Sequence, residues 1–113
     1  MESKAKAQFL RGSARKMRIV ADLVRKKSVT HAISMLHEAL SQKASYEIEK
    51  VIRAAVANIQ SREEGSNIDI DDLYVKSIAI DIGPQLKRIK PRAQGRAYLR
   101  LHRMNHVTVV VSD

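Results

Sequence analysis

Residues 86–103 read LKRIKPRAQGRAYLRLHR, and this stretch decides how the rest of the chain is interpreted. It contains seven Lys or Arg residues, no acidic residue, one proline and one glycine. It shows no apolar periodicity that would bury it, whereas the residues on either side are patterned like a small globular domain. The sequence therefore predicts that residues 83–105 leave the body of the protein and contact another molecule.

The residues that flank this stretch have the patterns of β-strands. From Leu73 the period is two, and the larger apolar side chains share one face: Tyr74, Ile78, Ile80 and Ile82. Residues 106–111, HVTVVV, form a β-branched run that is typical of a second strand. Such strands predict a hairpin over residues 83–105 that turns near residues 91–95, with arms reaching on the order of 30 Å at about 3.3 Å per residue.

Strand alternation predicts cations on both faces of this ribbon. One side of the first arm carries Lys87, and the other side carries Arg88, Lys90 and Arg92. A ribbon with two cationic faces suits a polyanion, because the planar guanidinium group of arginine can donate two hydrogen bonds to one phosphate. A flexible basic loop without a specific partner is the alternative.

Helical patterns occupy most of residues 13–62. We expect Ser13 to cap a helix that ends near Lys26, and Ser28 to cap a second helix. The apolar positions of this second helix are Ala32, Ile33, Leu36, Ala39 and Leu40. A third helix, from about Gln42 to Arg62, has the most regular apolar stripe: Ala44, Ile48, Val51, Ile52, Ala55, Val56 and Ile59.

A chain of 113 residues that is 44% hydrophobic and 4% aromatic predicts a single domain, residues 1–113, with an aliphatic core. Residues 1–12 contain few packing residues and are interpreted as an N-terminal arm. Residues 13–82 and 106–113 would form the globular body, with a polar loop at 63–67, and residues 83–105 the extended hairpin.

The net charge of +9 is unevenly distributed along the chain. Residues 1–27 carry +7, residues 28–82 carry −4 and residues 83–113 carry +6. Two basic blocks around an acidic middle indicate that the ends of the chain face a polyanion while the middle faces water. The N-terminal block would gather near the start of the first helix, whose free amides also attract phosphate.

No pattern in the chain predicts an enzyme or a metal site. The absence of cysteine excludes thiolate chemistry and disulfides. His102 and His106 would lie about 13 Å apart along a strand, too far to share an ion, and the acidic run at 69–72 is interpreted as a solvated turn or helix start. We expect no catalytic residues, no metal and no cofactor. No apolar run approaches the roughly 18 to 20 residues of a membrane span, so no membrane partner is expected.

The pattern of basic residues favours RNA among the nucleic acids. Aromatic platforms that stack single-stranded bases are missing, and a helix-turn-helix would push Glu47 and Glu49 of the third helix at the phosphates. Backbone and shape recognition of folded RNA remains. The alternatives are a DNA-binding architectural protein that uses the ribbon as an arm, and a basic helix lying on anionic lipid.

Several motifs together resemble a known family. Residues 92–96 read RAQGR, with Lys87 before them and His106-Val107 after them. Upstream lie GSARKMR (12–18), ADLVRKKSV (21–29), DDLYV (71–75) and GPQLKR (83–88). This set resembles the L-twenty-two family of large-subunit ribosomal proteins, in its bacterial form, over nearly the whole chain.

The resemblance implies an α+β fold, with three helices packed on a small three-stranded antiparallel sheet and a long protruding β-hairpin. It implies a structural constituent of the large ribosomal subunit that binds the subunit's RNA, supports assembly and lines the nascent-peptide exit tunnel with its hairpin. The implied partners are large-subunit ribosomal RNA, neighbouring ribosomal proteins and, transiently, the nascent peptide. We expect a monomer outside the ribosome and a cytoplasmic location, with an organellar ribosome as the alternative.

Charge pattern and resemblance together predict the residues that bind ribosomal RNA. The body would contribute Arg11, Ser13, Arg15, Lys16, Arg18 and Arg25. The hairpin would contribute Lys87, Arg88, Lys90, Arg92, Arg96, Arg100 and Arg103. The tip that lines the tunnel would consist of Pro91, Arg92, Ala93, Gln94, Gly95 and Arg96.

Overall fold

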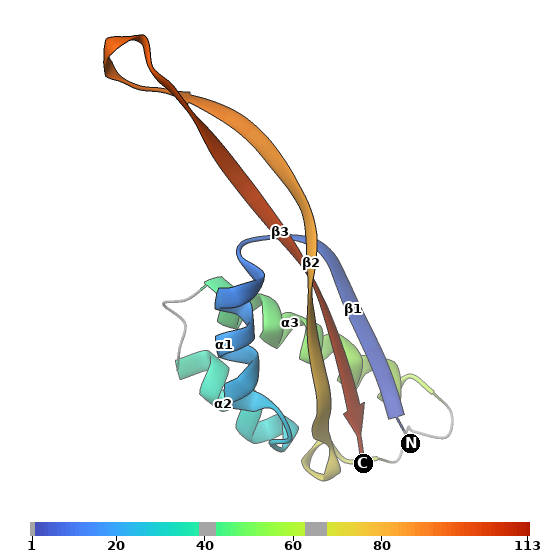
Figure 1. Cartoon of the computed structure of the whole chain (residues 1–113). Helices are drawn as coiled ribbons and strands as arrows, with labels where there is room; N and C mark the ends of the chain where they lie inside the picture. Colours follow the sequence, from blue (N-terminus) through green and yellow to red (C-terminus); the bar gives the residue numbers. More distant parts are fainter. Residues whose placement is uncertain (1, 39–42, 63–67) are drawn as a thin grey trace.

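The computed structural model describes residues 2–38, 43–62 and 68–113 and has an α+β fold (Figure 1). Its elements, in chain order, are β1 (Glu2–Arg11), α1 (Ala14–Val24), α2 (Val29–Glu38), α3 (Lys43–Gln60), η2 (Ile70–Asp72), β2 (Tyr74–Pro91), η3 (Ala93–Gly95) and β3 (Ala97–Ser112). The predicted positions Ala39, Leu40 and Gln42 and the predicted loop at 63–67 lie outside the described residues. The predicted fold class is confirmed: three helices and a three-stranded antiparallel sheet with a long hairpin.

The sheet has the order β1-β3-β2, with β3 in the centre and both neighbours antiparallel to it. Alternate residues of β3 point toward the helices, and Val107, Val109 and Val111 are fully buried. A run of β-branched residues suits this position, because the central strand contacts a neighbour on each edge and α3 on one face.

The N-terminal segment, which the sequence suggested as an arm, is instead the edge strand β1. Glu2 pairs with Ser112, and the ladder continues to Ala7 opposite Val107. Ser3 and Ala5 alternate into the interior against α3. Their side chains are small, so β1 lacks the large apolar residues by which strands are recognised, although it is held by backbone hydrogen bonds.

Strand β2 differs from its prediction in which residues face the core. Ile78 and Ile80 are buried as expected, but Val75 is buried in place of Tyr74. The register shifts between Val75 and Ser77, and such a bulge changes which alternate residues face the helices. Ile82 is 68% exposed and precedes the second shift, where the hairpin begins.

The helices match their predicted stripes, but the first differs at both ends. It ends at Val24 rather than Lys26, because Lys26 takes a left-handed conformation and pairs its N–H with Val75 of β2. Ser13 stands at the N-cap without a side-chain hydrogen bond, so its predicted capping bond is wrong. Ser28 does cap α2, since its hydroxyl accepts from the His31 N–H at 3.3 Å.

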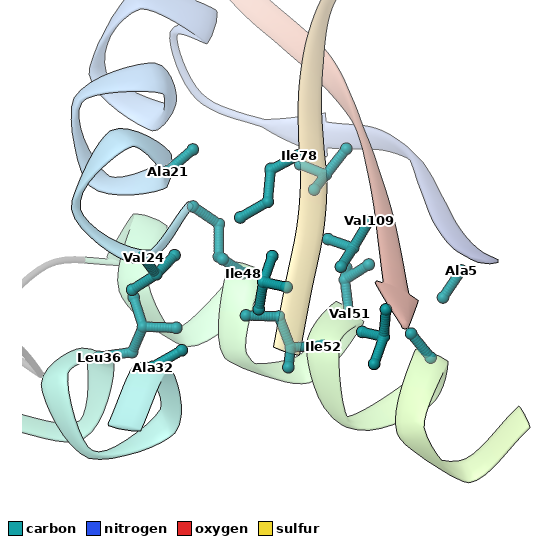
Figure 2. Close-up of a cluster of buried hydrophobic side chains, with 14 of the residues drawn as sticks. Ala5, Ala21, Val24, Ala32, Leu36, Ile48, Val51, Ile52, Ile78 and Val109 are labelled. Carbon is teal, nitrogen blue, oxygen red and sulfur yellow. The ribbon is translucent and has the colours of Figure 1, made fainter. Parts of the chain in front are cut away.

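The core lies between the helices and one face of the sheet, as Figure 2 shows. Ile48 and Ile52 of α3 occupy the space between Leu36 of α2 and the strands, where Ile78 and Val109 meet them. All buried hydrophobic residues in the described ranges are aliphatic, as composition predicts. Burial of each large aliphatic side chain stabilises the fold by roughly 1.5–3 kcal/mol, before entropy is counted.

The hairpin extends far beyond this core. Strands β2 and β3 stay paired from Gln85 opposite Arg103 to Pro91 opposite Ala97, and no residue from 84 to 100 is buried. The molecule therefore measures 65 × 26 × 16 Å with a radius of gyration of 17.2 Å. A compact domain of this length would have a radius of gyration of about 13 Å. The predicted protrusion is present, and nothing in the described chain covers it.

Candidate nucleic-acid interface

The hairpin tip is a tight turn with arginine on both sides. The Arg92 N–H donates to the Arg96 carbonyl at 2.7 Å, which closes the turn around η3. Gln94 and Gly95 have φ angles of 64° and 70°, a left-handed conformation that costs glycine nothing. The predicted tip, residues 91–96, lies at the far end of the hairpin with all its side chains exposed (Figure 1).

The strand register gives the ribbon two chemically different faces. The cationic face consists of Leu86, Arg88, Lys90, Tyr98, Arg100 and His102. The other face, termed the apolar face, consists of Gln85, Lys87, Ile89, Pro91, Ala97, Leu99, Leu101 and, at the hairpin base, Arg103. Both faces therefore carry cations, as predicted, but unequally: alternation separates Lys87 from the other cations of the first arm, and β3 adds only Arg103 to its face, at the base of the hairpin.

On the cationic face, Arg88 lies directly opposite Arg100. Like charges in this position destabilise a strand pair, and residues 83–103 contain no acidic side chain to compensate. On the other face Ile89 and Leu99 pair with each other but remain 75% and 63% exposed. Both observations indicate that contact with another molecule would stabilise the ribbon.

The N-terminal basic block meets the hairpin where the latter leaves the body. The Gly12 N–H donates to the Arg103 carbonyl at 3.0 Å, and the Asn105 side-chain amide donates to the Gly12 carbonyl at 3.1 Å. Asn105 is fully buried. Gly12 has a φ angle of 135°, which L side chains rarely adopt. These bonds hold the β1–α1 connection against β3, at the base of the hairpin.

Two grooves open at this junction. The cationic groove, of about 400 Å³, is lined by Arg11, Gly12, Ser13, Lys16, Arg100, Leu101, His102 and Arg103. A smaller neighbour, of about 140 Å³, is lined by Ser13, Ala14, Arg15, Arg18, Ile82, Gln85, Arg103 and Met104. Among the residues that the structure describes, no acidic residue lines either groove. Chain segments that are about 90 residues apart thus present one cationic surface.

The start of α1 adds to this surface. Its first turn holds no acidic residue, and the Ser13 side chain leaves the first amides without a cap. Free amides and the positive end of the helix dipole attract anions at such a position. Ser13 itself lines both grooves. The arrangement can accept an anionic group from solution, and its geometry suits a phosphate of a nucleic-acid backbone.

Two of the predicted RNA-binding arginines also form hydrogen bonds within the body. Arg18 donates from Nε and Nη2 to the Ile80 carbonyl, at 3.2 and 2.9 Å. Arg25 donates from Nη2 to the Ile78 carbonyl at 2.9 Å and forms an ion pair with Asp22. Both guanidinium groups therefore connect α1 to β2. Arg18 still lines the smaller groove, whereas Arg25 lines neither groove.

The structure distributes the remaining predicted residues from the base of the hairpin to its tip. Arg11, Ser13, Arg15, Lys16, Arg100 and Arg103 come together at the junction. Arg88 and Lys90 lie farther out on the cationic face, and Arg92 and Arg96 flank the tip. Lys87 lies on the apolar face, which it shares with Arg103 at the hairpin base. Sequence reasoning missed His102, which lines the cationic groove; only the strand register, which a bulge between Ile82 and Gln85 sets, reveals its position.

The other polar candidates have structural roles. His106 accepts a hydrogen bond at Nδ1 from the Phe9 N–H at 3.0 Å, and the Phe9 ring lies edge-on to it at 5.0 Å. Asp69 caps η2 by accepting from the Asp71 N–H, which agrees with the predicted helix start. Among residues 2–38, 43–62 and 68–113, no group of three potential ligands could hold a metal ion, and no helix could cross a membrane.

An α+β body with a long basic hairpin and a cationic groove at the hairpin's base is typical of proteins that bind the sugar-phosphate backbone of a nucleic acid. The family model described as ribosomal protein L22p/L17e matches residues 5–112, which is nearly the whole chain. The chain belongs to this family. The family consists of structural proteins of the large ribosomal subunit that bind ribosomal RNA and neighbouring ribosomal proteins, and it is not a family of enzymes.

Proposed function

We propose that the chain serves in ribosomes of the bacterial form, supports assembly of the large subunit and contributes its hairpin to the wall of the nascent-peptide exit tunnel. The single observation that carries this proposal is the uncovered hairpin. From residue 84 to residue 100 no side chain is buried, yet the two strands stay paired from Gln85 opposite Arg103 to Pro91 opposite Ala97. An isolated two-stranded ribbon is marginal in water, so this element requires a molecular surface to lie against.

Ribosomal RNA is the surface that matches the charges. The cationic groove and the cationic face together offer arginines and lysines at the base and along the length of the ribbon. Each phosphate that they neutralise releases counterions, which favours binding at moderate salt. An RNA that contacts both sites at once would fix the direction of the hairpin relative to the body. Such bridging is the physical basis of the proposed role in assembly.

The two-faced ribbon also supports the tunnel assignment. With its cationic face on RNA, the ribbon leaves Ile89 and Leu99 on the opposite side. At and beside the tip lie the small residues Ala93, Gly95 and Ala97, which let a ribbon two strands wide occupy a narrow passage. A wall of this kind permits transient contact with a nascent peptide and does not hold it. We propose a monomer outside the ribosome and a cytoplasmic location.

Competition binding tests this function. The whole protein should bind folded large-subunit ribosomal RNA more tightly than plain duplex DNA at the same salt concentration, and it should co-purify with large subunits at moderate salt. Equal or tighter binding to duplex DNA would contradict the proposal and favour a DNA-binding architectural protein. Co-sedimentation with acidic vesicles, and not with ribosomal subunits, would favour a membrane-surface protein instead.

A further inference from the structure

A pocket of about 410 Å³ lies beside the cationic groove. Both hollows are lined by Arg11, Gly12, Ser13 and Lys16, so they adjoin along one short stretch of chain. The pocket reaches from α1 to the start of α3. Its continuity with the cationic groove places it within the reach of any nucleic acid bound there.

The pocket differs from the groove in the chemistry of its walls. Met17 and Ile19 of α1 and Ala44 of α3 supply apolar surface, and Ile19 is 62% exposed although it is a large aliphatic residue. Arg11, Lys16 and Lys43 surround this apolar surface with positive charge. An apolar slot beside a phosphate site has the form that an unstacked nucleotide requires, since its base needs apolar contact while its phosphate needs cations.

One acidic residue, Glu47, lines this otherwise cationic pocket. Within the described parts of the chain its carboxylate forms no ion pair, whereas Glu49 on the same helix pairs with Arg53 at 2.9 Å. A carboxylate near RNA phosphates is unfavourable unless it accepts hydrogen bonds. The edges of bases supply such donors: guanine presents a ring N–H beside an amino group, adenine and cytosine present an amino group, and uracil presents a single ring N–H without an amino group beside it.

We propose that this pocket binds the base of one unstacked nucleotide of the partner RNA while the nucleotide's phosphate lies in the cationic groove. Met17, Ile19 and Ala44 contact the faces of the base, and Glu47 accepts hydrogen bonds from its edge. Guanine is preferred because its two adjacent donors match the two oxygens of the carboxylate. The inference rests on the proposed RNA-binding function and adds a specific site to it.

RNA duplexes with a single bulged nucleotide test the inference. The whole protein would be titrated with one duplex that carries a bulged guanosine, with the same duplex carrying a bulged uridine, and with the duplex lacking a bulge. The guanosine duplex should bind about tenfold more tightly than the uridine duplex, in line with the discrimination that one good bidentate contact provides. The amide resonances of the protein that shift when this duplex binds should include those of residues 11–17 and 43–47. Equal affinity for both bulged duplexes would overturn the inference.

Two variants and one control locate the effect. Glu47→Gln should reduce the preference for guanosine to about twofold or less, because an amide offers only one acceptor oxygen. Ala44→Leu should remove the advantage of any bulge by filling the pocket, while Ala54→Leu, at an exposed position on the same helix, should leave it unchanged. A guanosine preference that persists in Glu47→Gln would contradict the role of the carboxylate.

Binding to large-subunit ribosomal RNA, measured on the same samples, separates the two proposals. If the wild-type protein prefers that RNA to duplex DNA but does not distinguish the bulged duplexes, only the pocket assignment fails. If it shows no preference for ribosomal RNA, the proposed function itself fails.

Discussion

Arg15 and Arg18 lie three residues apart on α1 and are both exposed, yet the structure gives them different roles. Arg18 is bonded to the Ile80 carbonyl, whereas Arg15 lines a groove at the hairpin base. We expect Arg18→Ala to lower the free energy of unfolding by about 1 kcal/mol, the net contribution of a partly exposed hydrogen bond of this kind. Arg15→Ala should leave stability unchanged and weaken RNA binding.

Urea denaturation and RNA titration of both variants provide the measurement. The two substitutions remove the same side chain from the same helix, so each serves as the control for the other. An equal loss of stability in both variants would show that the Arg18–Ile80 contact contributes nothing specific.

Gly83 lies close against the backbone of the neighbouring strand. A Cβ atom built there would lie 3.1 Å from the backbone carbon and oxygen of Met104, on the neighbouring strand. Because backbone atoms cannot move aside as a side-chain end can, Gly83→Ala should destabilise the body by roughly 1–3 kcal/mol. Gly95→Ala, at the hairpin tip with nothing within 4 Å, should leave global unfolding unchanged despite local strain at a φ angle of 70°.

Thermal unfolding followed by circular dichroism distinguishes these glycine variants. A larger loss of stability in Gly95→Ala than in Gly83→Ala would contradict the description of the hairpin as separate from the core.

For single residues, the sequence predicted which side chains can donate or accept hydrogen bonds better than it predicted their partners. Ser28 caps α2 as expected, but Ser13, an equally good candidate, makes no capping bond. Arg18 and Arg25 are of a residue type that binds phosphate, but in the structure they donate hydrogen bonds to carbonyls of β2. The helical pattern identifies the arginine that donates. It gives no information about the acceptor, which lies on a strand more than 50 residues away along the chain.

The hairpin shows which features of a strand pair the sequence predicts and which it does not. Alternation along the first arm correctly separated Lys87 from Arg88 and Lys90. Which residues of the second arm join each face depends on the register, and a bulge between Ile82 and Gln85 sets that register. Likewise, the bulge after Val75 places Val75, and not Tyr74, toward the core. The small side chains of β1 give no strand pattern that the sequence would reveal. Single-residue shifts of this kind leave no periodic signal.

Substitutions on opposite faces of the ribbon test this division. The double variant Arg88→Gln with Arg100→Gln should reduce the slope of log affinity against log salt by about 0.7–0.9 for each lost phosphate contact. The control double variant Ile89→Gln with Leu99→Gln changes the same cross-strand geometry on the apolar face and should leave the slope unchanged. Equal changes in both would indicate that RNA surrounds the ribbon without regard to its faces.

The whole molecule consists of a body that is stabilised by its own core and a ribbon that is not. The 65 Å extent and the uncovered segment from residue 84 to residue 100 follow from one sequence property, a cationic stretch without a core pattern. That property, together with the family motifs, was sufficient to predict the protrusion. The convergence of the two basic blocks at one groove required the tertiary structure, because Gly12 and Asn105 bring them together across 93 residues.

Amide hydrogen exchange across residues 87–103, with and without large-subunit ribosomal RNA, tests the central claim that the partner of the hairpin is RNA. In the free protein these amides should exchange rapidly, because local opening of an uncovered ribbon costs little, while residues 107–111 of the same strand β3 should be protected. Addition of the RNA should protect residues 87–103 and leave the body unchanged. Strong protection without RNA, or no gain of protection with it, would contradict the account.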